Sequence, residues 1–232
     1  GGYAAFAPML AARLQGVPGI LHEQNAVAGT SNRTLARLAR VICLSLPGTR
    51  GFAPEKSVLT GNPVRRAVSE VGRRPRERRT RRLLVMGGSQ GARALNAFLP
   101  EILPALREAG VEIRHQSGLK DEDATRAAYA QAGYDPACVT AFIDDMAEAY
   151  AWADLALCRS GASTVAELCA AGLPAVLVPF PHAVHDHQTR NAQVLEKAGA
   201  ALLVPEGELR DKDLERVLPQ MLADSEGRAR MS

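Results

Sequence analysis

Two stretches of the sequence place glycines and hydroxyl side chains between an apolar run and a helical pattern, an arrangement that suits phosphate binding. In the first, LLVMGGSQGARALN, the glycines are Gly87, Gly88 and Gly91. Ser89 adds a hydroxyl, and backbone N–H groups at the start of the helix point at any anion placed there. The common dinucleotide motif would need glycine instead of Met86, and no Walker motif follows. The glycines indicate either a phosphate site or close helix–sheet packing.

The second stretch, ADLALCRSGASTVAELCAAGLPAVLVPF, has the order strand, turn, helix and strand. Its turn presents Ser160 to Thr164 at a second helix N-terminus, which again suits a diphosphate. One turn later, Glu167 could accept hydrogen bonds from both hydroxyls of a ribose. The T-x-x-E spacing of Thr164 and Glu167 also matches a capping box, which would occupy the carboxylate with backbone N–H groups. The residues alone leave both interpretations open.

A polar loop, PFPHAVHDHQTRNA, gathers side chains of the kind that bind metals or sugars. Four candidate metal ligands fall within six residues: His182, His185, Asp186 and His187. Their spacing fits no single helix face, and the loop follows Pro181, so a metal centre is the less favoured interpretation. A loop that reads a sugar through His187, Gln188 and Asn191 explains the same residues.

The segment LHEQNAVAGTSNR places polar residues at the end of a short apolar strand, at the sheet edge where α/β proteins bind ligands. His22 and Glu23 could form an acid–base pair there, with Asn25 as a hydrogen-bond donor to a ligand. An ordinary turn is the alternative, because Asn25 and Gly29 are common turn residues and Ser31 suits a helix N-cap.

The elements that must position these residues are those of a doubly wound α/β fold. From Leu83, apolar runs bounded by Gly and Pro alternate with amphipathic helical patterns, which predicts a parallel sheet covered on both faces. Before it, the pattern predicts only the end of another α/β unit, with helices at 3–15 and 31–39 and strands at 18–23 and 40–45. The opening GGYAAF is expected to be a native loop between a preceding strand and the first helix.

Composition places the chain among globular proteins, with 232 residues, 47% hydrophobic and 23% charged. No window is apolar enough to span a bilayer, and no segment has the form of a secretory signal. The four cysteines lack C-x-x-C spacing, which argues against a zinc ribbon and fits a reducing compartment.

The formal charge of +3 is concentrated in RRPRERRTRR, from Arg73 to Arg82. This run holds seven of the 28 basic residues and one of the 25 acidic ones, so the rest of the chain is slightly acidic. Such a block could contact nucleic acid or an anionic membrane. It lacks interleaved aromatic residues and contains Pro75, so a solvated linker is favoured.

Taken in order, several segments closely resemble the bacterial transferases that add N-acetylglucosamine to undecaprenyl-linked muramyl-pentapeptide, making lipid II for peptidoglycan. These segments are GGY, HEQN, GNPVR, GGSQGARALN, HQSG, FIDDM, RSGASTVAEL, GLPAVLVPFP and DHQTRNA. The resemblance implies the α/β fold of a GT-B glycosyltransferase, with two Rossmann-like domains. We therefore expect residues 1–62 to be a remnant of an N-terminal acceptor and membrane domain, 63–82 an Arg-rich linker, and 83–232 the UDP-sugar-binding domain.

The resemblance also implies roles for individual residues. Ile143 would meet the uracil, with Met146 packing nearby, and Glu167 would hold the ribose. The residues expected to face the diphosphate are Arg65, Ser89, Ala162, Ser163 and Thr164. Those expected around the N-acetylglucosamine are Asn25, Gln188 and Asn191. His22 and Glu23 become the catalytic candidates on the acceptor side, because the family's upstream loop with its histidine is absent from this sequence.

The implied reaction is an inverting transfer from UDP-N-acetylglucosamine to lipid I without metal or cofactor. Helix N-termini would stabilise the leaving diphosphate. The implied location is peripheral, on the cytoplasmic face of the bacterial plasma membrane. The expected partners are an anionic membrane surface and other cell-wall synthesis proteins, but no nucleic acid.

Two other functions compete with a complete transferase. The chain as given is expected to be inactive alone, so a module that binds UDP-N-acetylglucosamine without turnover is the first alternative. A UDP-N-acetylglucosamine 2-epimerase has the same two-domain architecture, but its catalytic carboxylates and histidines find no ordered match here.

Overall fold

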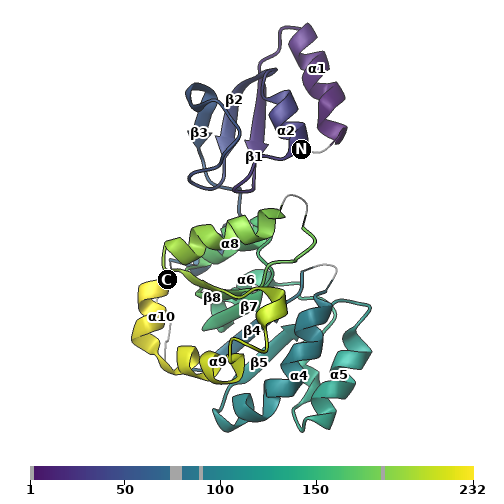
Figure 1. Cartoon of the computed structure of the whole chain (residues 1–232), viewed down its shortest axis with the longest axis vertical. Helices are drawn as coiled ribbons and strands as arrows, with labels where there is room; N and C mark the ends of the chain where they lie inside the picture. Colours follow the sequence, from purple (N-terminus) through teal and green to yellow (C-terminus); the bar gives the residue numbers. More distant parts are fainter. Residues whose placement is uncertain (1–2, 74–79, 89–90, 184–185) are drawn as a thin grey trace.

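The computed structural model of the chain describes residues 3–73, 80–88, 91–183 and 186–232. Two separate parallel sheets organise it, one of three strands and one of six (Figure 1). We call the part from α1 to β3 the small lobe and the part from α3 to α10 the large lobe. Among the described residues, no helix is both long and apolar enough to cross a membrane.

The small lobe has the strand order β1-β2-β3. Its elements are α1 (Phe6–Leu14), β1 (Gly19–Glu23), α2 (Thr30–Leu35), β2 (Ala39–Leu44) and β3 (Ser57–Leu59), with 3₁₀ turns at Tyr3–Ala5 and Pro54–Lys56. The helix expected at 31–39 is wrong at its C-terminal end, because Ala39 already pairs with Gly19 in the sheet. A buried cluster of only four residues forms the core of this lobe: Leu21, Leu35, Ala39 and Ile42.

The large lobe has the strand order β6-β5-β4-β7-β8-β9. Its strands are β4 (Arg82–Met86), β5 (Glu112–Gln116), β6 (Val139–Thr140), β7 (Leu155–Cys158), β8 (Ala175–Leu177) and β9 (Ala201–Leu203). The helices are α3 (Arg66–Val71), α4 (Arg93–Glu108), α5 (Glu122–Gln131), α6 (Met146–Trp152), α7 (Ala162–Ala171), α8 (His187–Lys197), α9 (Leu214–Ala223) and α10 (Ser225–Met231). Further 3₁₀ turns lie at Pro136–Cys138 and Glu206–Glu208. This order confirms the predicted doubly wound sheet. From β4 the chain adds β5 and β6 on one side and then β7, β8 and β9 on the other, so the order of strands reverses between β4 and β7.

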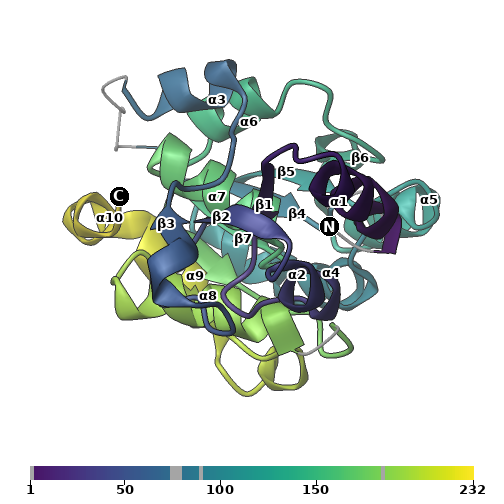
Figure 2. The same cartoon turned by 90° about the horizontal axis from the view of Figure 1, so that it is seen from above.

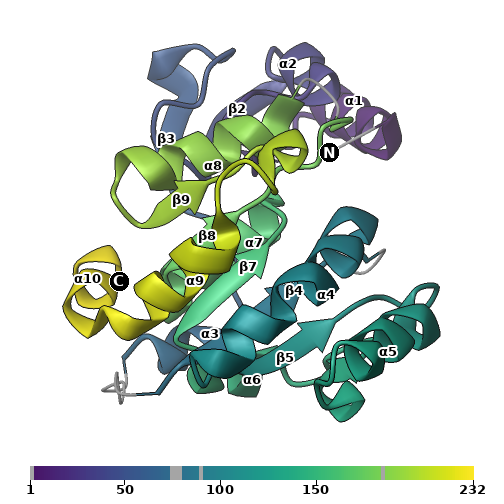
Figure 3. The ribbon, with the colours of Figure 1, turned by 60° about the horizontal axis from the view of Figure 1, so that its bottom comes forward.

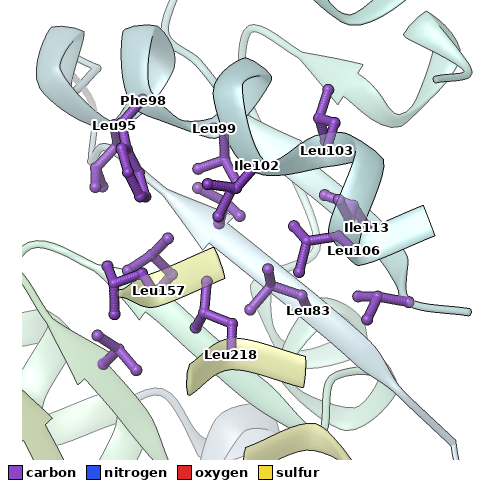
Figure 4. Close-up of a cluster of buried hydrophobic side chains, with 14 of the residues drawn as sticks. Leu83, Leu95, Phe98, Leu99, Ile102, Leu103, Leu106, Ile113, Leu157 and Leu218 are labelled. Carbon is purple, nitrogen blue, oxygen red and sulfur yellow. The ribbon is translucent and has the colours of Figure 1, made fainter. Parts of the chain in front are cut away.

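Helices cover both faces of the large sheet, which explains why its strands β4, β7 and β8 are almost entirely apolar. On β4, Leu83 and Val85 join the core that α4 and α9 cover (Figures 3 and 4). Leu84 and Met86 point the other way, into the core shared with α3, α6 and α7. Successive strand residues face opposite sides, so a strand buried on both sides needs an apolar residue at every position.

Helix α3 lies within the segment 63–82 that the sequence analysis expected to be a linker. It packs against α6 and α7, and Figure 2 shows α3 beside α6 at the margin of the large lobe. Val68 and Val71 of this helix are buried in the core of that lobe. Residues 74–79, most of the arginine run, lie outside the described residues.

Candidate functional site

The carboxyl ends of β4 and β7 lie side by side, where the strand order reverses. Met86 pairs with Cys158 in the last register position of the two strands. Ligands of open α/β sheets bind in the crevice beyond such a switch point. The two glycine-containing turns singled out from the sequence both begin there.

The glycine-rich turn after β4 is tightly packed at its two ends. A Cβ on Gly87 would lie 2.3 Å from the backbone nitrogen of Ala92, and one on Gly91 would lie 2.3 Å from the carbonyl oxygen of Ser117. Gly88 has a φ of +75° with open space beside it. Close packing therefore requires glycine at positions 87 and 91, whereas the space beside Gly88 is open to a ligand. Ser89, a predicted diphosphate contact, lies outside the described residues.

The turn after β7 leads into α7, whose N-cap is Gly161 without a side-chain hydrogen bond. The first three helical residues are Ala162, Ser163 and Thr164, and amides in the first turn of a helix have no partner within it. The capping-box alternative is wrong, because the helix begins two residues before Thr164. This N-terminus keeps N–H groups that can meet an anion.

Glu167 instead bonds to side chains from two other segments. The Tyr150 hydroxyl donates to its Oε2 at 2.9 Å, and an Arg65 guanidinium nitrogen lies 3.2 Å from its Oε1. Burial raises the pKa of Tyr150, and the neighbouring Glu167 carboxylate raises it further, so the phenol keeps its proton and donates. The Glu167 side chain is 19% exposed, which leaves it accessible from the cleft.

A cavity of about 160 Å³ brings four of the predicted nucleotide residues together: Ile143, Met146, Thr164 and Glu167. Sequence reasoning missed other lining residues, among them Gln116, Phe142, Tyr150 and Arg159. Gln116 and Phe142 belong to the quoted segments HQSG and FIDDM, which were the available signal. Tyr150 lies inside a helical pattern, and nothing in its local sequence marks it.

Gln188, from the polar segment singled out in the sequence, lies in the first turn of α8 and is engaged by other parts of the chain. Gln188 accepts a hydrogen bond through Oε1 from the Phe180 N–H at 3.0 Å, and its own carbonyl accepts one from the Ser160 hydroxyl at 2.9 Å. His187 lines a second cavity, of about 790 Å³, together with residues of the small lobe. Among the residues described, no group of three His, Cys, Asp or Glu side chains could hold a metal, and His185 lies outside them.

Asn191 joins the two lobes. This fully buried side chain on α8 accepts a hydrogen bond from the Ala26 N–H at 2.9 Å. Its amide nitrogen donates to Asn25 Oδ1 and to the carbonyl of Ser160, at 3.2 Å each. Figure 1 shows α8 as the element of the large lobe that faces the small lobe. In this arrangement the amide is occupied by protein groups, so its predicted contact with a sugar stays a prediction.

His22 and Glu23 do not form the pair that the sequence suggested. The Nε2 of His22 lies 3.1 Å from the carbonyl oxygen of Gly61 and 3.0 Å from the Ser45 hydroxyl. Glu23 is 3% exposed, and its carboxylate accepts hydrogen bonds from Asn25, Gly29 and Asn32 instead. Adjacent strand residues point to opposite faces, which separates the two side chains.

Hydrogen bonds thus hold both glutamates in place, but each of them lines a different cavity. Glu23 lines the 790 Å³ cavity with His22 and Asn25, on the side of the small lobe. Glu167 lines the 160 Å³ cavity on the side of the large lobe. The N-terminal turn of α7 and the Glu167 carboxylate therefore line the cavity of the large lobe, and the hydrogen-bonded loop of the small lobe lines the other cavity.

Comparison with known proteins agrees with this architecture. The model of the glycosyltransferase family 28 C-terminal domain matches residues 82–232, and that of the N-terminal domain of the same family matches residues 1–43. The fold is therefore that of a GT-B glycosyltransferase, in which the large lobe is one Rossmann-like domain and the three-stranded small lobe is part of the other, and the chain belongs to glycosyltransferase family 28.

Individual relatives are consistent with this family. The UDP-N-acetylglucosamine--N-acetylmuramyl-(pentapeptide) pyrophosphoryl-undecaprenol N-acetylglucosamine transferase of Nitratidesulfovibrio vulgaris (strain DP4) is 53% identical over all of this chain. The crystal structure of MurG from Acinetobacter baumannii is 43% identical, with a TM-score of 0.75 over all of this chain and 66% of that one. A UDP-N-acetylglucosamine 2-epimerase structure, 14% identical with a TM-score of 0.61 over 97% of this chain and 63% of that one, shares the fold alone. The chain spans 64% of the length of the Nitratidesulfovibrio relative.

Proposed function

We propose that this chain carries the donor site of a transferase that moves N-acetylglucosamine from UDP-N-acetylglucosamine to undecaprenyl-diphospho-muramyl-pentapeptide, with inversion. The observation that carries the proposal is the 160 Å³ cavity, where Ile143 and Met146 from one segment meet Thr164 and Glu167 from another. The name and 53% identity of the Nitratidesulfovibrio relative support the same donor and acceptor.

The chemistry of the proposed donor site follows from its walls. The uracil would lie against Ile143 and Met146, and the ribose hydroxyls would donate to Glu167. The diphosphate would take the first-turn amides of α7, with Arg65 as a nearby positive charge. When the bond to the sugar breaks, negative charge develops on the leaving diphosphate, and preorganised N–H groups at a helix N-terminus stabilise it.

The proposed acceptor side is the 790 Å³ cavity of the small lobe. His22 is the candidate side chain for proton transfer there, since its ring is only half-buried. Glu23 would act by holding the loop that carries Asn25, which faces the sugar from this side. The lipid acceptor would bring the protein to the cytoplasmic face of the membrane, where anionic lipid and other cell-wall synthesis proteins are the proposed partners.

The direct test is calorimetric titration of this chain with UDP-N-acetylglucosamine, with CDP and TDP as nucleotide controls. A transfer assay with a water-soluble lipid I analogue follows, in which formation of the disaccharide product is measured. We expect binding that UDP competes away and that CDP and TDP do not.

The two measurements separate the possible outcomes. Binding with transfer supports the whole proposal, and binding without transfer limits this chain to a donor-binding module. A chain that binds neither UDP-N-acetylglucosamine nor UDP, although its circular dichroism shows it folded, contradicts the assignment of the cavity.

A further inference from the structure

The end of β5 contacts both loops that frame the proposed donor cavity. Gln116, the last residue of this strand, is 6% exposed and lines the cavity. Its Nε2 donates to the carbonyl oxygen of Gly88 at 2.8 Å and to that of Ala141 at 3.4 Å. Carbonyl oxygens only accept hydrogen bonds, so the side-chain amide must present its nitrogen to both.

The two carbonyl groups belong to different loops at the cavity, which Gly88 itself lines and which Ala141 only adjoins. Gly88 lies in the glycine-rich turn after β4, on the side assigned to the diphosphate. Ala141 directly precedes Phe142 and Ile143, on the side assigned to the base. One side chain therefore links the two loops across the site.

The backbone around Gln116 is anchored independently of its side chain. The Ser117 and Gly118 N–H groups donate to the carbonyls of Thr140 and Ala141, at 2.9 and 3.2 Å. On the other face, Asn96 donates to the Ser117 carbonyl at 2.9 Å and is itself held by His115 at 3.0 Å. Loss of the Gln116 amide should therefore loosen the two loops without unpairing β5.

We propose that Gln116 is a positioning residue of the donor site, which holds the diphosphate loop and the base loop at the separation that one nucleoside diphosphate spans. The proposal rests on the proposed function of this cavity. A ligand that contacts both loops binds more tightly when their separation is fixed, because the loops then lose less conformational freedom on binding. The affinity of a ligand that contacts only one loop depends little on that separation.

The test compares Gln116→Met, which keeps the length of the side chain and removes its donor, with Gln131→Met, the same change at an exposed position at the end of α5. Each variant is titrated with UDP, uridine and pyrophosphate. We expect Gln116→Met to lower UDP affinity about tenfold, the effect of one to two hydrogen bonds. Uridine and pyrophosphate affinities should change much less, and the control variant should bind all three as the unaltered chain does.

Equal losses for the three ligands, or no loss for UDP, would overturn the proposal, because a general structural effect does not depend on whether a ligand spans both loops. If the unaltered chain binds none of the ligands, the proposed function fails separately. Hydrogen exchange then tests the link itself. Faster amide exchange at 87–88 and 141–143 in Gln116→Met, with β4 unchanged, supports it, and unchanged exchange at these loops contradicts it.

Discussion

The two lobes are stabilised in different ways. The large lobe buries its sheet under helices on both faces, with fully buried leucines such as Leu83, Leu84 and Leu157. The small lobe has a core of four residues, and apolar side chains such as Ile20 remain 65% exposed. A buried carboxylate, Glu23, organises its loop through hydrogen bonds.

This difference explains why similar residues have different roles in the two lobes. A well-packed sheet can hold loops with unpaired amides and an accessible carboxylate, because their geometry does not depend on those groups. In the small lobe the polar groups themselves hold the loop. Glu167 lines a cavity while Tyr150 and Arg65 hold its carboxylate, whereas the buried Glu23 carboxylate holds its own loop.

The largest expected effect is on the core of the large lobe. Leu157→Ala should lower the free energy of unfolding by about 2–5 kcal/mol, because it leaves a cavity between β7 and the helices above it (Figure 4). Urea unfolding followed by the fluorescence of Trp152, the only tryptophan, measures this directly. Leu119→Ala, at a side chain 83% exposed, is the control and should have little effect. Equal effects of the two changes would contradict the described core.

A second test concerns the buried histidine of the large lobe. His115 contacts Tyr129 and Asn96, and burial lowers its pKa to about 4. The unfolded chain binds this proton near pH 6.5, so the histidine should lower stability by up to about 3 kcal/mol as the pH falls from about 6.5 to 4. Urea unfolding across this range in the unaltered chain and in His115→Gln measures the difference. The same pH slope in both proteins would exclude His115 as its source.

The polar centre of the small lobe gives a smaller, local effect. Glu23→Ala removes the carboxylate that accepts hydrogen bonds from the Gly29 N–H and the Asn32 side-chain amide, which should cost about 1–3 kcal/mol. Amide hydrogen exchange should accelerate in β1 and β2, while the Trp152 transition of the large lobe changes little. Glu55→Ala, at an exposed position of the same lobe, is the matched control. A parallel loss of stability in both lobes would show that they do not unfold separately.

The smallest effect on stability, but a clear one on binding, is expected at Glu167. Glu167→Ala should weaken UDP-N-acetylglucosamine binding by about 1–3 kcal/mol, because the ribose hydroxyls lose their acceptor. Its unfolding midpoint should move less than that of Glu23→Ala, since the carboxylate is partly exposed. Calorimetry and urea unfolding of both variants check this contrast. Unchanged affinity with a large loss of stability would instead make Glu167 a structural residue like Glu23.

Local sequence was enough to predict the sheet of the large lobe, whereas the resemblance to a known family supplied several members of its cavity. Apolar runs bounded by glycine and proline are a local signal of strands buried on both faces, and they predicted the doubly wound fold. Ile143, Met146 and Glu167 were assigned to one ligand through the resemblance to the lipid II-forming transferases, and the structure places them in one cavity. Their individual contacts with a ligand stay predictions.

What the sequence by itself determined was therefore the class of fold and the segments that meet at its carboxyl edge, because hydrophobic periodicity and turn chemistry act between near neighbours. Tertiary structure alone decided which polar groups meet. Tyr150 reached Glu167, and Asn191 reached Ala26 across 165 positions of the sequence. Hydrogen-bond partners so distant depend on how sheets and helices pack, and so the same packing committed Glu23 to its own loop and left Glu167 facing the cavity.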